Sequence, residues 1–80
     1  MIKSVYNSRY QALLAYLKNA RLEQGLTVRD VGELIDEPFQ FVSKIENGQR
    51  KLTAHEFVQY CEFLKIDPIA GLKLLSKKKK

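Results

Sequence analysis

The sequence has little cysteine, histidine or proline, and each shortage excludes a class of protein. Of its 80 residues, one is Cys, one is His and two are Pro. A lone cysteine cannot form a disulfide within the chain, so the fold does not depend on an oxidising compartment. The single histidine, His55, has no partner at metal-ligand or catalytic spacing, and the chain has no glycine-rich phosphate loop. We therefore expect neither an enzyme nor a bound metal or cofactor.

Long apolar runs are also missing. No stretch approaches the roughly 18 apolar residues that a membrane-spanning helix needs, and polar residues follow Met1-Ile2-Lys3 where a signal peptide would be apolar. We expect a cytoplasmic protein with no membrane partner. A hydrophobic content of 45% over 80 residues predicts one small domain, which we assign to residues 1–76.

Outside its last four residues, the sequence lacks an excess of positive charge. Lys77–Lys80 contribute four charges to the net +5, and the remaining 76 residues hold 10 basic and 9 acidic side chains. The high pI therefore belongs to the tail, and charge alone is weak evidence for nucleic-acid binding. We expect residues 77–80 to form a solvated, disordered basic tail.

The strongest local pattern lies between residues 26 and 51. Thr27 is a good N-cap, and Asp30 three residues later completes a capping box. Apolar side chains then recur at helical spacing, namely Val28, Val31, Leu34 and Ile35. Pro38 predicts the start of a second helix, and Gly48 suits a left-handed position just after its end. Two short helices joined by a tight turn, at about residues 27–47, are typical of a helix-turn-helix.

The second of these helices has two different faces. Val42 and Ile45 share one face, whereas the opposite face carries only polar groups, those of Gln40, Ser43, Lys44 and Asn47. Amide, hydroxyl and ammonium groups can form hydrogen bonds with base edges in the major groove of DNA. The polar face is therefore a candidate DNA-contacting surface.

Three further helices are predicted around this pair. The first runs from about Ser8 to Gln24 and has the apolar stripe Tyr10, Leu13, Leu14, Leu17 and Leu22. A second capping box, Thr53 with Glu56, opens a helix to about Lys65 with the buried stripe Phe57, Tyr60, Cys61 and Leu64. Asp67-Pro68 opens a last helix with Ile69, Leu72 and Leu75 on its apolar side. Five helices without a plausible strand pair predict an all-α fold.

The order and spacing of these residues resemble the lambda-repressor/Cro-like family of transcriptional regulators, also called the xenobiotic-response-element family. The similarity extends from about Leu17 to Leu75 and includes Arg21, Gly25-Leu26-Thr27, Val31, Ile35, the run from Val42 to Gly48, and Arg50-Lys51. It implies a five-helix DNA-binding domain and a sequence-specific regulator. Such regulators usually bind two-fold operators on double-stranded DNA as homodimers, most often as repressors.

The resemblance also implies a role for individual residues. The base contacts would come from the helix that begins at Pro38, through Phe39, Gln40, Ser43 and Lys44. The phosphate contacts would come from the N-terminus of the preceding helix and from the loop after Gly48, through Thr27, Val28, Asn47, Arg50 and Lys51. An ion pair between Arg21 and Glu46 would join the first helix to the end of the recognition helix.

Three residues depart from the family pattern. Val28 replaces a glutamine that commonly helps to hold a phosphate, and Asp36 replaces the usual glycine of the turn. Phe39 stands at a contact position that is usually polar. Its ring could contact a thymine methyl group, or it could pack on the helix that contains Val28.

An alternative function is a protein-interaction module that keeps the fold but binds DNA weakly or not at all. The nearly neutral domain, Val28 and the two aromatic residues Phe39 and Phe41 favour a protein partner, because aromatic side chains often anchor interfaces. The unbroken polar face of the second helix argues against this alternative, since a groove that binds only protein would not need it.

Overall fold

The structure, a computed structural model, describes residues 8–76 and consists there of five helices without a strand. In chain order they are α1 (Ser8–Glu23), α2 (Val28–Ile35), α3 (Phe39–Glu46), α4 (Ala54–Leu64) and α5 (Pro68–Ser76). The all-α prediction is confirmed, and each helix boundary that the sequence predicted lies within one residue of its expected position. The lysine tail, residues 77–80, lies outside the described residues. None of the described helices is long and apolar enough to cross a membrane.

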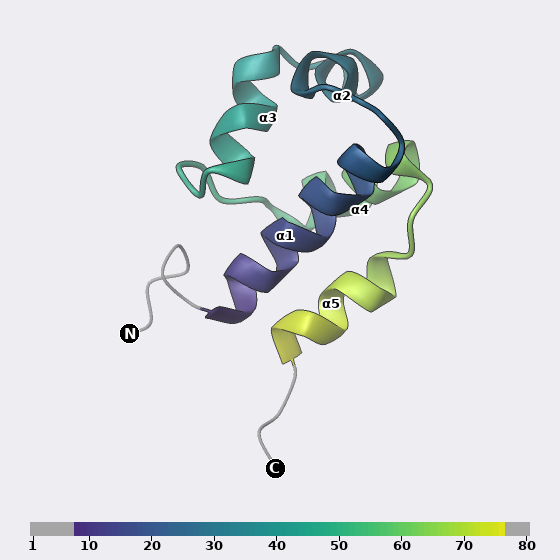
Figure 1. The fold of residues 1–80 in the computed structure, drawn as a ribbon. Coiled ribbons are helices and arrows are strands. Elements are labelled where there is room, and N and C mark those ends of the chain that lie inside the picture. The colour runs from purple at the N-terminus through teal and green to yellow at the C-terminus, as the bar shows by residue number, and fades with distance from the viewer. Residues whose placement is uncertain (1–7, 77–80) are drawn as a thin grey trace.

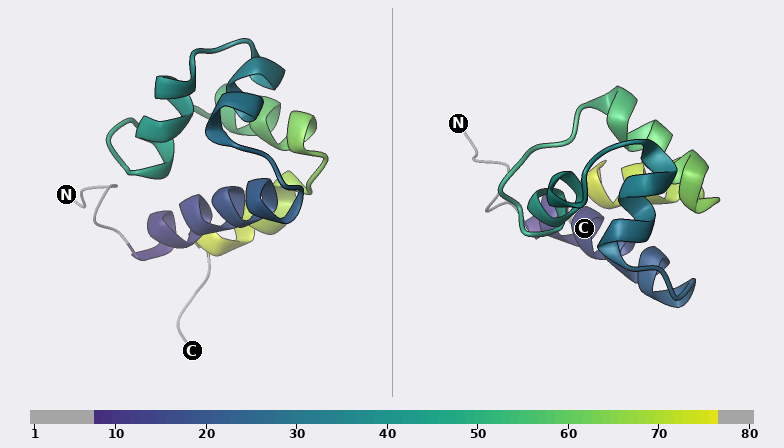
Figure 2. Two further views of the ribbon diagram at one scale, coloured as in Figure 1. Left: turned by 45° about the horizontal axis from the view of Figure 1, so that its top comes forward. Right: turned by 90° about the horizontal axis from the view of Figure 1, so that it is seen from above.

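The helices form two packed pairs with α4 between them. α2 packs against α3, α1 packs along α5, and α4 contacts α1, α2 and α5 (Figures 1 and 2). Two hydrogen bonds fasten α1 to the connection between α4 and α5. Gln24 Nε2 donates to the carbonyl of Leu64 at 2.6 Å, and the Tyr16 hydroxyl donates to the carbonyl of Asp67 at 2.8 Å.

Both predicted capping boxes are present. At the start of α2, the Asp30 N–H donates to Thr27 Oγ1 at 3.1 Å and the Thr27 N–H donates to Asp30 Oδ2 at 2.8 Å. Thr53 and Glu56 repeat the arrangement at the start of α4, with distances of 3.0 and 3.1 Å. Each box satisfies two backbone N–H donors with side-chain acceptors, so the sequence alone locates these helix starts well.

The turn between α2 and α3 depends on two special backbone positions. Asp36, which replaces the usual glycine, adopts the left-handed conformation, with φ 59° and ψ 46°, at a cost of roughly 1–2 kcal/mol. The chain then passes so close to α2 that a Cβ atom on Gly32 would lie 2.6 Å from the carbonyl oxygen of Glu37. The position where a glycine is sterically required is therefore Gly32, inside α2, and not Asp36 in the turn.

The core consists of side chains from α1 to α4. The most deeply buried are Leu17, Val31, Val42, Ile45, Tyr60, Cys61 and Leu64. The predicted stripes of α3 and α4 are confirmed. Burial raises the pKa of the Cys61 thiol to about 11, so at neutral pH this residue is a small apolar core residue rather than a reactive thiolate.

Four residues predicted on apolar stripes are exposed instead. They are Leu22 (52%), Leu34 (41%), Ile69 (60%) and Leu72 (47%). In α5 the reason is Gly71, which is the residue that lies against the core: a Cβ atom there would be 2.8 Å from the ring of Phe57 and 3.1 Å from Leu13. Because α5 approaches α1 and α4 through its glycine, its larger side chains on other faces extend into solvent.

Candidate nucleic-acid interface

The polar face of α3 points away from the core. Val42 and Ile45 are 0% exposed, so the helix is fixed by its apolar side. On the other side Gln40, Lys44 and Asn47 are exposed, and Ser43 is half-buried. α3 begins at Phe39 with Pro38 as its N-cap residue, and Asn47 caps its end. The four polar side chains thus lie together on one short, well-supported helix.

The N-terminus of α2 provides backbone donors next to this face. The first N–H groups of a helix point out of its end and suit an anion. The capping box uses the N–H of Asp30, and the side chain of Val28 is half-buried. Val28 can therefore offer only its backbone N–H to a phosphate, and the carboxylate of Asp30 in the same turn opposes one.

The loop after α3 contains one charged group that is already paired within the protein. Arg50 Nη1 and Nη2 donate to the two carboxylate oxygens of Glu56 at 2.9 and 3.0 Å, and the guanidinium lies 4.4 Å from the centre of the Phe41 ring. The hydrogen bonds from Arg50 lower the pKa of Glu56 from its ordinary 4.5 to about 2. The sequence analysis assigned Arg50 to a phosphate and did not foresee this pair. Asn47 and Lys51 in the same loop are exposed.

The ion pair expected between Arg21 and Glu46 is present and buried. Arg21 Nε and Nη2 donate to the two carboxylate oxygens of Glu46 at 2.7 and 2.9 Å, and Nη1 donates to the carbonyl of Leu26 at 2.9 Å. The two side chains are only 10% and 7% exposed. The pair fixes the end of α3 to α1.

Phe39 packs on α2, which is one of the two placements of its ring that the sequence allowed. The Arg29 guanidinium of α2 lies over the Phe39 ring, 4.2 Å from its centre, and the Phe39 residue is half-buried. No role for Arg29 was predicted from the sequence. The sequence feature that could have predicted this contact is a cation in the first turn of one helix followed by an aromatic residue in the first turn of the next.

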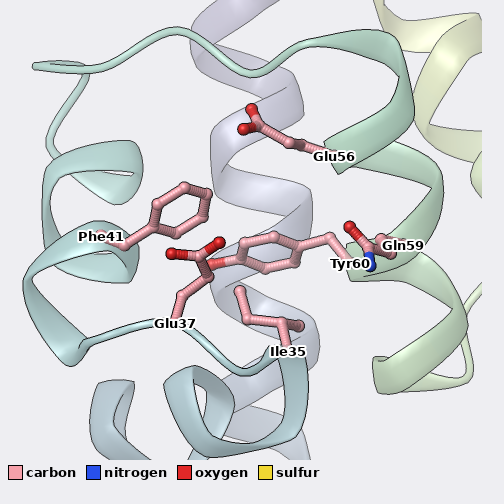
Figure 3. A pocket seen from close by; sticks show the side chains of 6 residues that line it. All are labelled: Ile35, Glu37, Phe41, Glu56, Gln59 and Tyr60. Atoms are coloured by element: carbon pink, nitrogen blue, oxygen red, sulfur yellow. The ribbon is translucent and has the colours of Figure 1, made fainter.

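A small cavity lies behind α3, where the helix-turn-helix rests on α4. Figure 3 shows the Tyr60 ring pointing from α4 toward Glu37 and Phe41, with Ile35 beside it. Tyr60 is 1% exposed, and among the described residues its hydroxyl has no hydrogen-bond partner. Burial raises the pKa of this hydroxyl well above its ordinary value, so it stays protonated. The turn is therefore supported from behind mainly by apolar contact.

These features define a helix-turn-helix domain with an exposed polar recognition helix. Residues 17–69 match the model of the helix-turn-helix family. The solved structure of an XRE-family like protein from Pseudomonas syringae pv. tomato str. DC3000 is 39% identical, with a TM-score of 0.82; the alignment covers 94% of this chain and 93% of that chain. No curated protein matches the sequence. The chain belongs to the XRE/lambda-repressor-like helix-turn-helix family, whose members are DNA-binding transcription regulators.

Proposed function

We propose that the protein binds a two-fold DNA operator as a homodimer and represses transcription by occupying it. α3 would lie in the major groove, with Gln40, Ser43 and Lys44 on the base edges. The observation that carries this proposal is the orientation of α3, because Val42 and Ile45 are fully buried while the polar side chains face outward. A glutamine can pair with adenine and a lysine with guanine through the major groove.

The phosphate contacts would flank this helix on both sides. Thr27 and Val28 stand at the N-terminus of α2, and Asn47 and Lys51 lie exposed in the loop after α3. We assign Arg50 a contact through N–H groups that do not bond to Glu56, and a second role in holding the loop on α4. Since residues 28–51 carry four basic and five acidic side chains, few counterions would be released and non-specific affinity would be modest.

The homodimer would cover apolar side chains that α4 and α5 leave exposed. Val58 and Leu72 line an apolar groove of about 270 Å³ together with Leu52, and Ile69 lies one turn before Leu72 on α5. A second copy of the chain that covered this groove would place two recognition helices about a two-fold axis, as a two-fold operator requires.

The groove also favours the alternative of a different protein partner. Phe39 and Phe41 give that alternative less support than their sequence positions indicated, because an arginine lies over each ring. Stacked in this way, the two rings are less available as apolar interface anchors.

Selection from a random pool of double-stranded DNA tests the proposal. We expect an enriched two-fold sequence whose affinity falls with salt, because the phosphate contacts release counterions. The variant Lys44→Ala should reduce the enrichment, whereas Lys18→Ala, an exposed lysine of α1, is the matched control and should not. An enriched sequence without two-fold symmetry would contradict the dimer. Absence of any enrichment, with salt-insensitive binding to a protein, would favour the alternative.

A further inference from the structure

The contact between Arg29 and Phe39 joins the two helices of the helix-turn-helix at the end that would enter DNA. Arg29 is the second residue of α2, and Phe39 is the first residue of α3. The guanidinium carbon lies 4.2 Å from the ring centre, which places the cation on the ring face. Below, these two side chains together are called the Arg29–Phe39 stack.

The stack leaves the hydrogen-bond donors of Arg29 available. Arg21 and Arg50 are ion-paired, whereas within residues 8–76 no carboxylate pairs with Arg29. A guanidinium that stacks through its face keeps its in-plane N–H groups free for a bidentate acceptor. Arg29 is also exposed, so a ligand can reach these donors.

The surroundings of the stack disfavour a phosphate as that ligand. Arg29 and Phe39 line an open pocket of about 180 Å³ with Glu33, Glu37 and Pro38. Two carboxylates beside the guanidinium would repel a phosphate, but they would repel a neutral acceptor much less. The major-groove edge of guanine offers such acceptors, O6 and N7, in the geometry that a guanidinium matches.

The ring of Phe39 supplies the second part of the site. An aromatic ring in the first turn of a recognition helix can contact the methyl group of thymine. Successive bases along one strand are 3.4 Å apart, close to the 4.2 Å between the guanidinium and the ring centre. Two groups at this separation can reach two adjacent base pairs.

We propose that the Arg29–Phe39 stack is a base-recognition subsite for a thymine methyl group and a guanine at adjacent base pairs. Phe39 contacts the methyl group and holds Arg29 in plane with the guanine, to which Arg29 donates two hydrogen bonds. This proposal rests on the proposed function, because it requires α3 to enter the major groove. It adds Arg29 to the residues that determine sequence preference.

Modified operators test the two halves of the subsite separately. In the DNA selected by the wild-type protein, we expect adjacent thymine and guanine in each half-site. Replacing that thymine by deoxyuridine removes only the methyl group, and replacing that guanine by 7-deazaguanine removes only N7. Each change should weaken wild-type binding about fivefold to tenfold.

Three variants should respond differently to these operators. Arg29→Gln should bind the 7-deazaguanine operator as well as the unmodified one, while it still prefers thymine to deoxyuridine. Phe39→Ala should lose both preferences. Phe39→Leu should keep the preference for the methyl group and lose most of the preference for N7, because leucine offers an apolar contact but no ring for the guanidinium. Lys18→Gln on α1 is the matched control and should keep both preferences.

Failure of this proposal can be distinguished from failure of the proposed function. If Gln40→Ala and Lys44→Ala change the selected sequence while Arg29→Gln and Phe39→Ala keep both preferences, the subsite is wrong and the proposed function stands. If the wild-type protein selects no sequence, both are wrong. Thermal unfolding of each variant checks that the fold is retained. If Phe39→Ala loses binding because it is unfolded, Arg29→Gln decides whether the subsite exists, since Arg29 is exposed.

Discussion

Two arginine–glutamate pairs of the same chemistry occupy different environments in this protein. Arg21 and Glu46 are 10% and 7% exposed, whereas Arg50 and Glu56 are 40% and 21% exposed. Both pairs are bidentate, with donor–acceptor distances of 2.7–3.0 Å. Because the hydrogen-bond geometry is so similar, we expect the difference in burial to decide how much each pair contributes to stability. The buried pair fixes α3 to α1, and the exposed pair holds the loop beside α4.

The largest effect should follow from breaking the buried pair. Arg21→Ala leaves the Glu46 carboxylate buried without its partner, and it also removes the hydrogen bond to Leu26. We expect a loss of roughly 3–5 kcal/mol in the free energy of unfolding, measured by urea denaturation. The double variant Arg21→Met/Glu46→Leu should lose less than Arg21→Ala. A loss under about 1 kcal/mol for Arg21→Ala, as for a surface pair, would remove the distinction between the two pairs.

A smaller loss should follow from breaking the exposed pair. Arg50→Ala removes a half-buried ion pair and a contact with Phe41, so we expect a loss of about 1 kcal/mol. Glu56→Ala should cost more, up to about 2 kcal/mol, because Glu56 Oε1 also accepts from the Thr53 N–H in the capping box. Addition of 1 M NaCl should weaken the contribution of this pair and leave that of the buried pair nearly unchanged. Equal salt sensitivity of the two pairs would contradict the comparison.

The exposed pair should also be visible in the acid response. Because the hydrogen bonds from Arg50 lower the pKa of Glu56 to about 2 in the folded protein, the unfolded state binds a proton first as the pH falls. The stabilisation is therefore complete above about pH 4.5 and is lost as the pH falls toward 2. Glu56→Gln should reduce the loss of stability over this window. The control Glu62→Gln, an exposed residue of the same helix, should keep the wild-type pH dependence.

The smallest effect concerns a buried polar group that, unlike Arg21, has no partner among the described residues. Tyr60→Phe removes only the hydroxyl that points toward Glu37 and Phe41 in the cavity of Figure 3. Removing an unpaired buried hydroxyl while keeping the ring is nearly neutral or slightly stabilising. We expect a change within about 0.5 kcal/mol of zero. A thermal melt decides this, and a clear destabilisation would mean that the hydroxyl has a partner in solution.

The sequence predicted best those features that depend on neighbouring residues. Both capping boxes follow from a Thr and an acidic residue three positions later, and the left-handed Asp36 follows from the tolerance of aspartate for that conformation. The Arg21–Glu46 pair came from the family resemblance rather than from spacing, since the two residues are 25 positions apart.

The features that sequence analysis missed depend on the path of the chain in space. The buried face of α5 is set by the close approach of Gly71 to Phe57, which helical periodicity does not reveal. Arg50 meets Glu56 because the loop folds back on the start of α4. The Arg29–Phe39 stack likewise requires the tight turn that Gly32 permits. The contacts of Arg50 and Arg29 change which side chains remain available to DNA.

The central claim is that the polar face of α3 contacts bases, and the ratio of two affinities tests it most directly. The ratio is Kd on a scrambled duplex divided by Kd on the selected operator, measured at two salt concentrations for wild type, Lys44→Ala and Lys51→Ala. Lys44→Ala should lose roughly 1–3 kcal/mol on the operator and little on the scrambled duplex. Lys51→Ala should weaken both about equally and reduce the salt slope by about one. An unchanged ratio for Lys44→Ala, with equal weakening on both duplexes or none, would contradict the claim.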